Sequence, residues 1–336
     1  MKDLGCLATH RGYLGEKPLG GSVKPFPCSA AKVFKTQVLA LAKRLKAIRV
    51  TKVVIGLSGG LDSALALLVA DAAFEKLGLD KKGIYVITMP GFGTSSRTKG
   101  NAELLCEGLG LEIETISIVK SVKQHLKDIG HDGKTADITY ENAQARMRTL
   151  ILMDKANMVG GIVLGTGDMS EIALGWCTYN GDHMSMFAVN NGVPKTIVRK
   201  VCEWWSLKEG SSAAARALKD IVDTPVSPEL VKGQITENTI GPYELHDFFL
   251  WNFIVNEMGS KYLKEAALKY FGERFSAEEI DRTLAIFLRR FFTQAFKRNC
   301  QPDGVKVGSV GISPRGDWKM PSDAVAKLWV TEAESL

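Results

Sequence analysis

The stretch KVVIGLSGGLDSALALLVADAAFEKLG, residues 52–78, decides the fold. It opens with a short β-branched run, passes through a glycine-rich turn and continues as an apolar helical pattern from Asp62. Gly78 is placed where a helix would stop. We therefore predict that KVVIGLSGG (52–60) forms a strand and a loop, and that this loop leads into a helix over 62–78.

The same order of strand, glycine turn and helix recurs along the first half of the chain. GIYVITMPGFG (83–93) precedes a helical pattern around Asn101–Leu109, IETISI (113–118) alternates apolar and polar residues, and GIVLGTG (161–167) follows a long helix from about Tyr140 to Met158. Strands that alternate with helices form βαβ units, so we expect an α/β fold with a parallel sheet covered on both faces. Ligands of such sheets bind at the carboxyl ends of the strands, where these glycines fall.

The segments around this core have other patterns. A helix is predicted from about Phe34, because Val38, Leu41, Leu45 and Ile48 are spaced by three and four residues on one face. Residues 1–30 are rich in Gly, Pro and Lys without periodicity, which is typical of a tail or linker.

The second half of the chain is predicted to be mostly helical. Residues 197–220 and 244–299 carry the helical patterns, IGPYE (240–244) separates them, and a mixed tail covers 302–336. Since no domain boundary is evident after the tail or linker, we treat residues 31–336 as one domain.

Composition restricts the class of protein. The chain has 336 residues, of which 45% are apolar and 24% charged, and its formal net charge is +6. This apolar fraction excludes a disordered polymer, and no apolar run approaches the roughly 18 residues of a membrane span. The absence of an apolar signal core after Met1 and of any CxxC pair favours a reduced cytoplasmic protein. A charge of +6 suits anionic ligands but is too small to indicate nucleic-acid binding.

The loop from Gly56 to Ser63 carries the strongest chemical signal. Glycines before a helix let backbone N–H groups approach an anion, and the hydroxyls of Ser58 and Ser63 add donors. Asp62 would repel a phosphate unless a divalent cation lay between them, so it predicts a metal ligand. The loop lacks the lysine of GxxxxGK[ST] and the spacing of GxGxxG. A tight turn whose glycines serve packing is the structural alternative.

Three further polar clusters add candidates. Asn142 and Arg146 share a helix face, which fits a phosphate or carboxylate site as well as it fits a solvated surface. Glu171 follows a strand end and could join Asp62 on Mg²⁺, or simply favour its own helix N-terminus. Lys195, after a Val-Pro turn, could stabilise charge on a transferring phosphoryl group, and Lys297 is a similar case.

These motifs together resemble NAD synthetases, most closely the synthetase part of the glutamine-dependent bacterial type. The resemblance spans about residues 30–330. The stretches that carry it are IGLSGGLDS, TMPGFGTSSRTKGNA, YENAQARMRT, LGTGDMSEIALGWCTYNGD, VPKT, DTPVSPEL, IGPYELHDFFL, FKRN and SPRGDWKMPSD.

The resemblance implies an adenine nucleotide alpha-hydrolase-like fold, that of the ATP pyrophosphatases, and an ATP-dependent amidation of deamido-NAD (nicotinic acid adenine dinucleotide) to NAD through an adenylate. It implies three sets of site residues. ATP would be bound by Gly56, Leu57, Ser58, Gly59, Gly60, Leu61, Asp62, Ser63, Thr166, Lys195 and Ser227. Deamido-NAD would be bound by Asn142, Arg146, Glu171, Trp176, Cys177, Thr178, Tyr179 and Lys297. Asp62 and Glu171 would bind Mg²⁺, and with Lys195 they would form the catalytic set.

The resemblance also raises the questions of nitrogen source and assembly. Glutamine-dependent relatives carry an amidase domain upstream, for which residues 1–30 leave no room. We therefore expect that the chain uses free ammonia, receives ammonia from a separate amidase subunit, or is a fragment of a longer protein. Relatives form homodimers with the dinucleotide site at the interface, and Phe248–Phe253 could be interface or core. The alternatives are another ATP pyrophosphatase such as a GMP synthetase, and an inactive nucleotide-binding subunit. We expect neither nucleic acid nor membrane as a partner.

Overall fold

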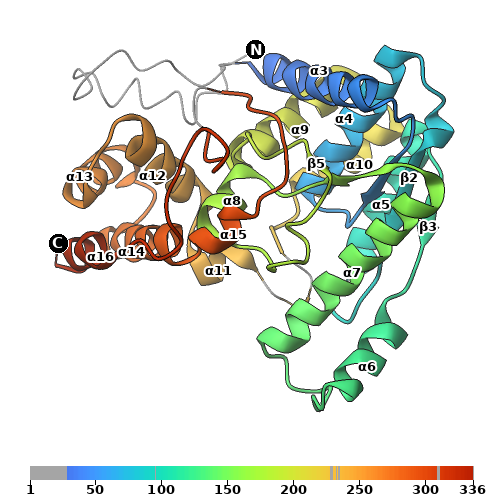
Figure 1. Ribbon diagram of the computed structural model, residues 1–336. Helices are drawn as coiled ribbons and strands as arrows, with labels where there is room; N and C mark the ends of the chain where they lie inside the picture. Colours follow the sequence, from blue (N-terminus) through green and yellow to red (C-terminus); the bar gives the residue numbers. More distant parts are fainter. Residues whose placement is uncertain are drawn as a thin grey trace.

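The computed structural model describes residues 29–94, 96–227, 230–231, 233, 235–308 and 311–335. Within them, five strands form one parallel sheet in the order β3-β2-β1-β4-β5 (Figure 1). The strands are β1 (Val53–Gly56), β2 (Ile84–Thr88), β3 (Ile113–Thr115), β4 (Ile162–Gly165) and β5 (Phe187–Ala188). The predicted parallel sheet is confirmed.

Helices cover both faces of this sheet. They are α3 (Ala30–Ile48), α4 (Leu61–Leu77), α5 (Ser96–Leu109), α6 (Val119–Asp128), α7 (Ile138–Val159), α8 (Met169–Leu174), α9 (Lys195–Glu209) and α10 (Ala213–Val222), with a short 3-10 turn at Lys81–Gly83. Successive side chains of a strand point to opposite faces. Accordingly, Val53 and Ile55 join a large core with α3, α4, α5, α9 and α10, whereas Val54 joins a smaller core with α6 and α7.

The second half forms a helical lobe beside the sheet (Figure 1). Its helices are α11 (Thr236–Ile240), α12 (Tyr243–Val255), α13 (Ser260–Phe271), α14 (Ala277–Thr293), α15 (Ala295–Asn299) and α16 (Lys327–Glu334). The aromatic run Phe248–Phe253 is buried on α12, and the Phe253 ring centroid lies 5.3 Å from those of Phe291 and Trp329. Of the two uses left open for this run, the structure shows the core.

Local boundaries follow the predicted patterns with a few differences. Helix α4 ends at Gly78, whose φ of +64° suits a glycine cap, as predicted. On α3, Val38, Leu41 and Leu45 are buried, but Ile48 in the last turn is 40% exposed. The strand after residue 113 stops at Thr115, and the predicted helical stretches are divided by turns, so that 197–220 becomes α9 and α10.

The strand order places a topological switch beside β1. The chain moves from β1 to β2 and β3 on one side, then returns to β4 and β5 on the other, which leaves a crevice at the carboxyl ends of β1 and β4. The segment after α15 returns to this part, since Gly304 forms an isolated bridge with Ala188 and Asn191 Nδ2 donates to Pro302 O at 3.0 Å. The helical lobe is thereby tied to the sheet.

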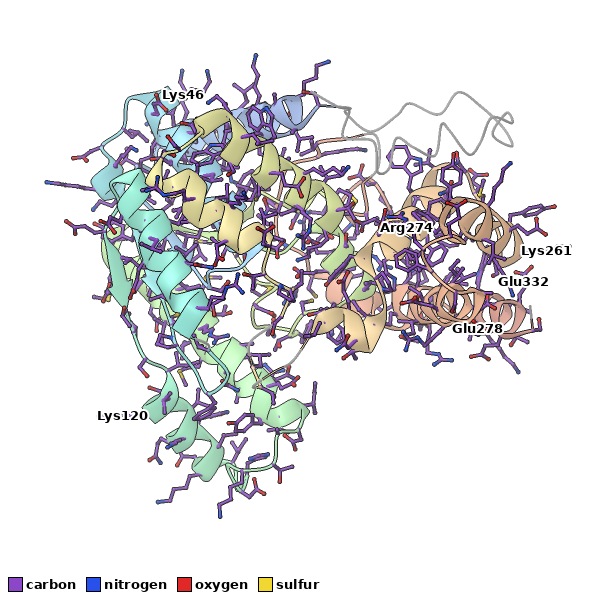
Figure 2. The ribbon with its side chains drawn as sticks, turned by 180° about the vertical axis from the view of Figure 1, so that it is seen from behind. Lys46, Lys120, Lys261, Arg274, Glu278 and Glu332 are labelled. Carbon is purple, nitrogen blue, oxygen red and sulfur yellow. The ribbon has the colours of Figure 1, made fainter. Side chains whose placement is uncertain are left out.

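The surface carries its charges on several separate elements. Figure 2 shows Lys46 on α3, Lys120 on α6, Lys261 on α13 and Glu332 on α16 at the outer edges of the molecule. Among the described helices, none has the length and apolar character needed to cross a membrane.

Candidate active site

A pocket of about 800 Å³ opens at the carboxyl edge of the sheet. All predicted site residues except Lys195 line it: Gly56, Leu57, Ser58, Gly59, Gly60, Leu61, Asp62, Ser63, Asn142, Arg146, Thr166, Glu171, Trp176, Cys177, Thr178, Tyr179, Ser227 and Lys297. One continuous pocket therefore joins the glycine loop with the cluster on α7 and the stretch after α8. Lys195 lies just behind this surface and is 3% exposed.

The glycine loop is held in one conformation by its own hydroxyls and by α5. Ser63 Oγ accepts from the backbone N–H of Ser58 at 3.2 Å and lies 3.0 Å from Ser58 Oγ, which in turn accepts from the Gly60 N–H at 3.1 Å. Gly59 has a φ of +85°, and a Cβ there would lie 2.1 Å from the carbonyl oxygen of Thr98. Only glycine fits this position, because the backbone of the loop packs directly against that of α5.

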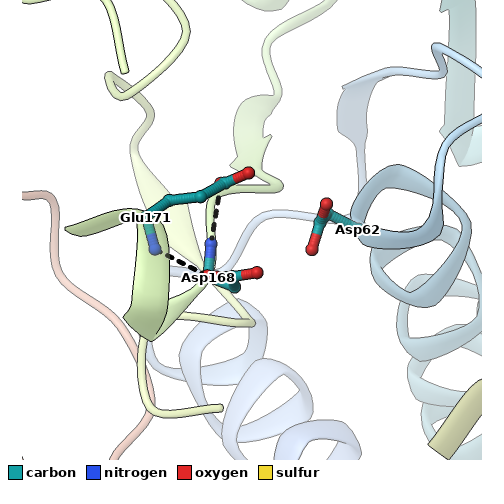
Figure 3. A group of neighbouring side chains, drawn as sticks. All are labelled: Asp62, Asp168 and Glu171. Carbon is teal, nitrogen blue, oxygen red and sulfur yellow. Dashed lines mark hydrogen bonds between the residues drawn. The ribbon is translucent and has the colours of Figure 1, made fainter. Parts of the chain in front are cut away.

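Three carboxylates from two helix N-termini meet beside the loop (Figure 3). Asp62 is in the first turn of α4, while Asp168 is the N-cap of α8 and Glu171 completes a capping box with it. One oxygen from each carboxylate lies within 4.8 Å of one from each of the other two. Helix N-termini favour nearby anions, which helps to explain why acidic side chains accumulate here.

Lys195, the first residue of α9, lies against all three carboxylates. Its Nζ is 2.5 Å from Asp62 Oδ2, 2.9 Å from Asp168 Oδ2 and 2.9 Å from Glu171 Oε1. Burial opposes the charged ammonium, but the carboxylates outweigh it and raise the pKa of Lys195 well above its ordinary value. For Glu171, burial has the opposite effect and raises the pKa to about 7. Burial also raises the pKa of Asp168 well above its ordinary value, so three acidic groups share one ammonium in this cluster.

The helical lobe supports this cluster from behind. The Tyr243 ring of α12 lies over the ammonium, with its centroid 5.2 Å from Lys195 Nζ. Asp247, also on α12 and buried, accepts hydrogen bonds from the hydroxyls of Ser170 and Thr196 and from the Thr196 N–H. Ser170 Oγ accepts in turn from the N–H of Lys195 at 2.9 Å. The first turns of α8 and α9 are thus fixed to α12.

A single amide joins the two strand-end loops. Asn190 Nδ2 donates to the carbonyl oxygens of Asp62 and Thr166, both at 3.0 Å. Asn190 Oδ1 accepts from Gln37 Nε2 of α3 at 2.9 Å, and Gln37 is fully buried. The distance between the loop after β1 and the loop after β4 is therefore set by side chains of the protein itself.

At the far end of the pocket, α7 holds the stretch that follows α8. Asn142 Oδ1 accepts from Thr178 Oγ1 at 2.8 Å, and Arg146 Nε donates to Tyr179 O at 3.2 Å. The two residues do share a helix face, as predicted, and they place Thr178 and Tyr179 at the pocket. The ring of Tyr179 stacks on that of His183 at 5.6 Å.

Three cations from α14 and α15 bind the carbonyl oxygens around the end of α8. Arg290 Nε donates to Leu174 O at 2.9 Å, Lys297 Nζ to Cys177 O at 2.7 Å and to Gly175 O at 3.0 Å, and Arg298 to Ala173 O at 3.1 Å. The Arg290 guanidinium also lies 4.9 Å from the ring centroid of Trp176. Cations stabilise a helix C-terminus, so this arrangement fixes the turn that carries Trp176 and Cys177.

Cys177 is not built as a nucleophile. Burial raises the pKa of its thiol far above the ordinary range. His183 Nδ1 is engaged with Thr178 O at 3.0 Å, and burial lowers the pKa of its ring. A thiolate with a basic partner is what nucleophilic catalysis requires, so Cys177 has the character of a pocket-lining residue.

Gln144 connects two loops that border the pocket. Its Oε1 accepts from the Phe92 N–H after β2, and its Nε2 donates to Leu230 O after α10, both at 3.0 Å. Gln144 is fully buried, and Thr94 and Leu230 line the pocket. Helix α7 thereby determines where both loops stand.

Sequence reasoning did not single out Asp168, Tyr243, Asp247, Arg290 or Gln144. Asp168 lies in the same GTGDMSE stretch as Glu171, three residues before it. This spacing is the signature of a capping box, so the sequence explains Asp168 as a helix cap and gives no sign that it contacts Lys195. Tyr243 lies in the IGPYE stretch, which only marked a break between helices. For Asp247, Arg290 and Gln144, the contacts that matter to the site are made with residues more than 50 positions away in the chain, which no local pattern indicates.

Comparison with known proteins gives matches over most of the chain. The family model described as NAD synthase matches residues 32–285. The glutamine-dependent NAD(+) synthetase of Mycobacterium leprae is 41% identical over 335 residues, which cover 90% of this chain and 49% of that protein. The chain thus spans about half the length of these mycobacterial relatives.

Solved structures share the fold. The NMN synthetase from Francisella tularensis superposes with a TM-score of 0.59 at 26% identity, over 78% of this chain and 94% of its own. A glutamine-dependent NAD(+) synthetase from Cytophaga hutchinsonii gives a TM-score of 0.73 at 19% identity, over 90% of this chain and 56% of its own. The second likeness concerns the fold alone.

Proposed function

The chain belongs to the NAD synthase family, and from that premise we propose that it converts deamido-NAD to NAD with ATP and ammonia. The observation that carries this proposal is the single pocket that joins the glycine loop and the carboxylates to the polar stretch Trp176–Tyr179. Such a pocket can hold a nucleoside triphosphate together with a second ligand that contacts it.

The glycine loop is proposed to bind the phosphates of ATP. Its backbone approaches the pocket at Gly59 and Gly60, and the N-cap of α4 is Gly60, so no side chain caps this helix. The positive end of α4 and the hydroxyls of Ser58 and Ser63 would then face the phosphates. Thr166 and Ser227 also line the pocket and are proposed to contact ATP.

The carboxylate cluster fits a divalent cation. Asp62 Oδ1 is buried and has no hydrogen-bond partner, and the three carboxylates offer oxygens within 4.8 Å of one another. A compact, all-oxygen donor set suits Mg²⁺. We propose that Asp62 and Glu171 hold it, with Asp168 as a third candidate; when bound, Mg²⁺ would neutralise charge on the phosphates.

The residues of the chain would divide the chemistry between the two ends of the pocket. The far end, with Asn142, Arg146, Lys297 and Trp176–Tyr179, would hold the dinucleotide so that its nicotinate carboxylate faces the α-phosphorus of ATP. That carboxylate attacks phosphorus, pyrophosphate leaves, and ammonia then displaces AMP from the adenylate. Holding two reactants in line accounts for much of the rate in such transfers.

Ammonia, rather than glutamine, is proposed as the nitrogen donor of this stretch of chain. Glutamine hydrolysis would need a reactive thiolate, and three of the four described cysteines are unsuited to that role, because burial raises the pKa of Cys106 to about 12 and also raises those of Cys177 and Cys202. Ammonia from solution or from an amidase unit would therefore have to enter the pocket. The cytoplasm, where thiols stay reduced, is the compartment that we propose, in line with the four free cysteines of the described residues.

We also propose a homodimer in which α7 contacts the second copy. Only Ala143, Gln144, Ala145 and Ala156 of this 22-residue helix are buried. Ile138, Leu150 and Met158 are more than half exposed along it, and Figure 1 shows that α7 extends past the sheet. Exposed apolar side chains on one element favour a protein interface. Leu150→Glu should lower the mass measured by light scattering from dimer to monomer, whereas a monomeric parent protein would contradict the assembly.

Activity is tested by incubating the chain with ATP, Mg²⁺, ammonium and deamido-NAD, and following NAD and AMP by mass spectrometry. NAD and AMP in equal amounts are expected, and their absence would overturn the proposal. A parallel reaction with nicotinic acid mononucleotide tests the smaller substrate suggested by the Francisella likeness. Asp62→Ala should abolish both products while the thermal unfolding profile stays that of a folded protein.

A further inference from the structure

Lys195 has an unexpected position for a residue that should reach a phosphate. The resemblance predicts contact with ATP, yet the side chain is 4% exposed and does not line the pocket. Its ammonium instead lies within 3 Å of Asp62, Asp168 and Glu171. An ammonium has three donors and no acceptor, so the carboxylates occupy the directions that a phosphate would need.

The same position is the one that a divalent cation would take. The oxygens of the three carboxylates lie within 4.8 Å of one another, so small side-chain shifts bring all three into contact with one cation placed between them. Carboxylate oxygens bind Mg²⁺ at about 2.0–2.1 Å and Mn²⁺ prefers the same donors. A metal ion and the Lys195 ammonium would repel each other at such a separation, so occupancy by one excludes the other.

The side chain is able to leave without disturbing the helix that carries it. The backbone of α9 is fixed at its first residues, because the Lys195 N–H donates to Ser170 Oγ and the Thr196 N–H to Asp247 Oδ2, both at 2.9 Å. The flexible four-carbon stem of lysine can rotate about this fixed point. Asp62 and Glu171 face the pocket with about a fifth of each side chain exposed, so the exit leads to the phosphate end.

We propose that Lys195 is a resident counter-cation of the carboxylate cluster, which a divalent cation displaces toward the pocket. This inference rests on the proposed function, since it reconciles the predicted ATP contact with the buried position. Without metal, Lys195 neutralises part of the cluster and keeps three acidic groups together. With metal, the same ammonium is released where phosphates would bind, so that metal and lysine reach the nucleotide together.

The direct test measures the chemical accessibility of Lys195 in the unmodified chain, with Mn²⁺ as the only added ligand. The protein is acetylated briefly with and without Mn²⁺, labelling is quantified by mass spectrometry, and exposed Lys261 serves as the internal reference. Labelling of Lys195 relative to Lys261 should rise at least about tenfold with bound Mn²⁺, because a 4% exposed amine becomes open to the reagent. Bound Mn²⁺, counted by electron paramagnetic resonance, with unchanged labelling would overturn the proposal.

A second measurement uses Lys195→Met and needs neither ATP nor dinucleotide. Removal of the competing charge should tighten Mn²⁺ binding by at least roughly tenfold, about 1.4 kcal/mol. Lys264→Met is the matched control, because Lys264 also pairs with a carboxylate, its Nζ lying 2.8 Å from Asp281 Oδ2. Equal or weaker binding than in the parent protein would show that Lys195 positions the carboxylates instead of competing with the metal.

The test remains decisive even if Lys195→Met does not fold without metal. If Lys195→Met unfolds without metal, the proposal requires that Mn²⁺ restore its folded state, since one cation replaces another. A variant that stays unfolded with Mn²⁺ would contradict the proposal. NAD synthesis is assayed separately. If the parent protein makes NAD but Lys195→Met binds Mn²⁺ no more tightly, this inference alone is rejected. If the parent protein makes no NAD but its Lys195 labelling depends on Mn²⁺, only the proposed reaction is rejected.

Discussion

Gln144 offers the sharpest test of how α7 organises the pocket. Its amide oxygen accepts from the Phe92 N–H and its amide nitrogen donates to Leu230 O, both at 3.0 Å, at a fully buried position. Gln144→Glu keeps an acceptor for Phe92 but removes the donor to Leu230. Gln144→Met has a similar length and removes both. The two variants therefore separate the two loops.

The expected cost follows from these bonds. A buried hydrogen bond contributes about 1 kcal/mol net, and a carbonyl left facing a carboxylate costs about 1–3 kcal/mol unless it moves into water. The loop that carries Leu230 is therefore expected to open in Gln144→Glu, at a cost of about 1.4 kcal/mol in the closed state. That energy lowers the closed-to-open ratio of the loop roughly tenfold, so the KM for ATP should rise by up to about that factor while kcat changes little.

Hydrogen exchange with mass spectrometry, combined with steady-state kinetics, measures both effects. In Gln144→Glu, the Phe92 amide should stay protected while peptides containing Leu230 exchange faster. In Gln144→Met, both regions should exchange faster and the KM should rise at least as much.

Two results would refute this reasoning. If Gln144→Glu left both KM and exchange near Leu230 unchanged, the bond to Leu230 would not hold that loop. If the Phe92 amide lost protection equally in both variants, the oxygen of residue 144 would not act as its acceptor.

Three further predictions concern the loop, the far end of the pocket and the core. Gly59→Ala should lower kcat/KM for ATP by at least roughly tenfold, because a Cβ would lie 2.1 Å from Thr98 O at a φ of +85°. Gly60→Ala, whose Cβ would come no closer than 3.3 Å to another atom, should have the milder effect in the same assay. Equal losses would contradict the steric argument. Lys297→Met should raise the KM for the dinucleotide several-fold with the KM for ATP unchanged, because it frees the carbonyls of Gly175 and Cys177; a rise for ATP alone would place Lys297 elsewhere. Burial lowers the pKa of His246 from 6.5 to about 4, so the folded state should lose up to about 3 kcal/mol of stability as pH falls through this window, since the unfolded chain binds the proton first. In urea titrations, the free energy of unfolding of His246→Gln should depend less steeply on pH there, and an unchanged pH dependence would assign the effect to other groups.

The sheet and the loop were predictable because their signals are local. The run 52–60 carries its strand and its glycines within nine residues and the helix follows directly, and the structure has β1 and α4 at those places. Asp62 and Glu171 were predicted from their positions just beyond two strand ends, and a parallel sheet brings such positions together. The register of β1 with β4 then accounts for their meeting.

The rest of the site depends on contacts that no local pattern encodes. Asp247 directly precedes the aromatic run Phe248–Phe253, which indicates core, and its hydrogen bonds with Ser170 and Thr196 arise only because α12 packs against α8 and α9. Lys195 was predicted at the phosphates, but the contacts that it makes are decided by three acidic groups distant in sequence. Long-range packing of charged groups is the part of the fold that periodicity does not report.

Asn190 determines when the entropy of ordering the two loops is lost. Its amide joins the backbones of Asp62 and Thr166 and is itself held by Gln37. The entropy of bringing the two loops together is therefore lost when the chain folds, before any ligand arrives. Ligand affinity at this edge of the sheet should then depend on the integrity of α3, a helix that never touches the pocket, and mutations at Gln37 should behave as distant affinity mutations.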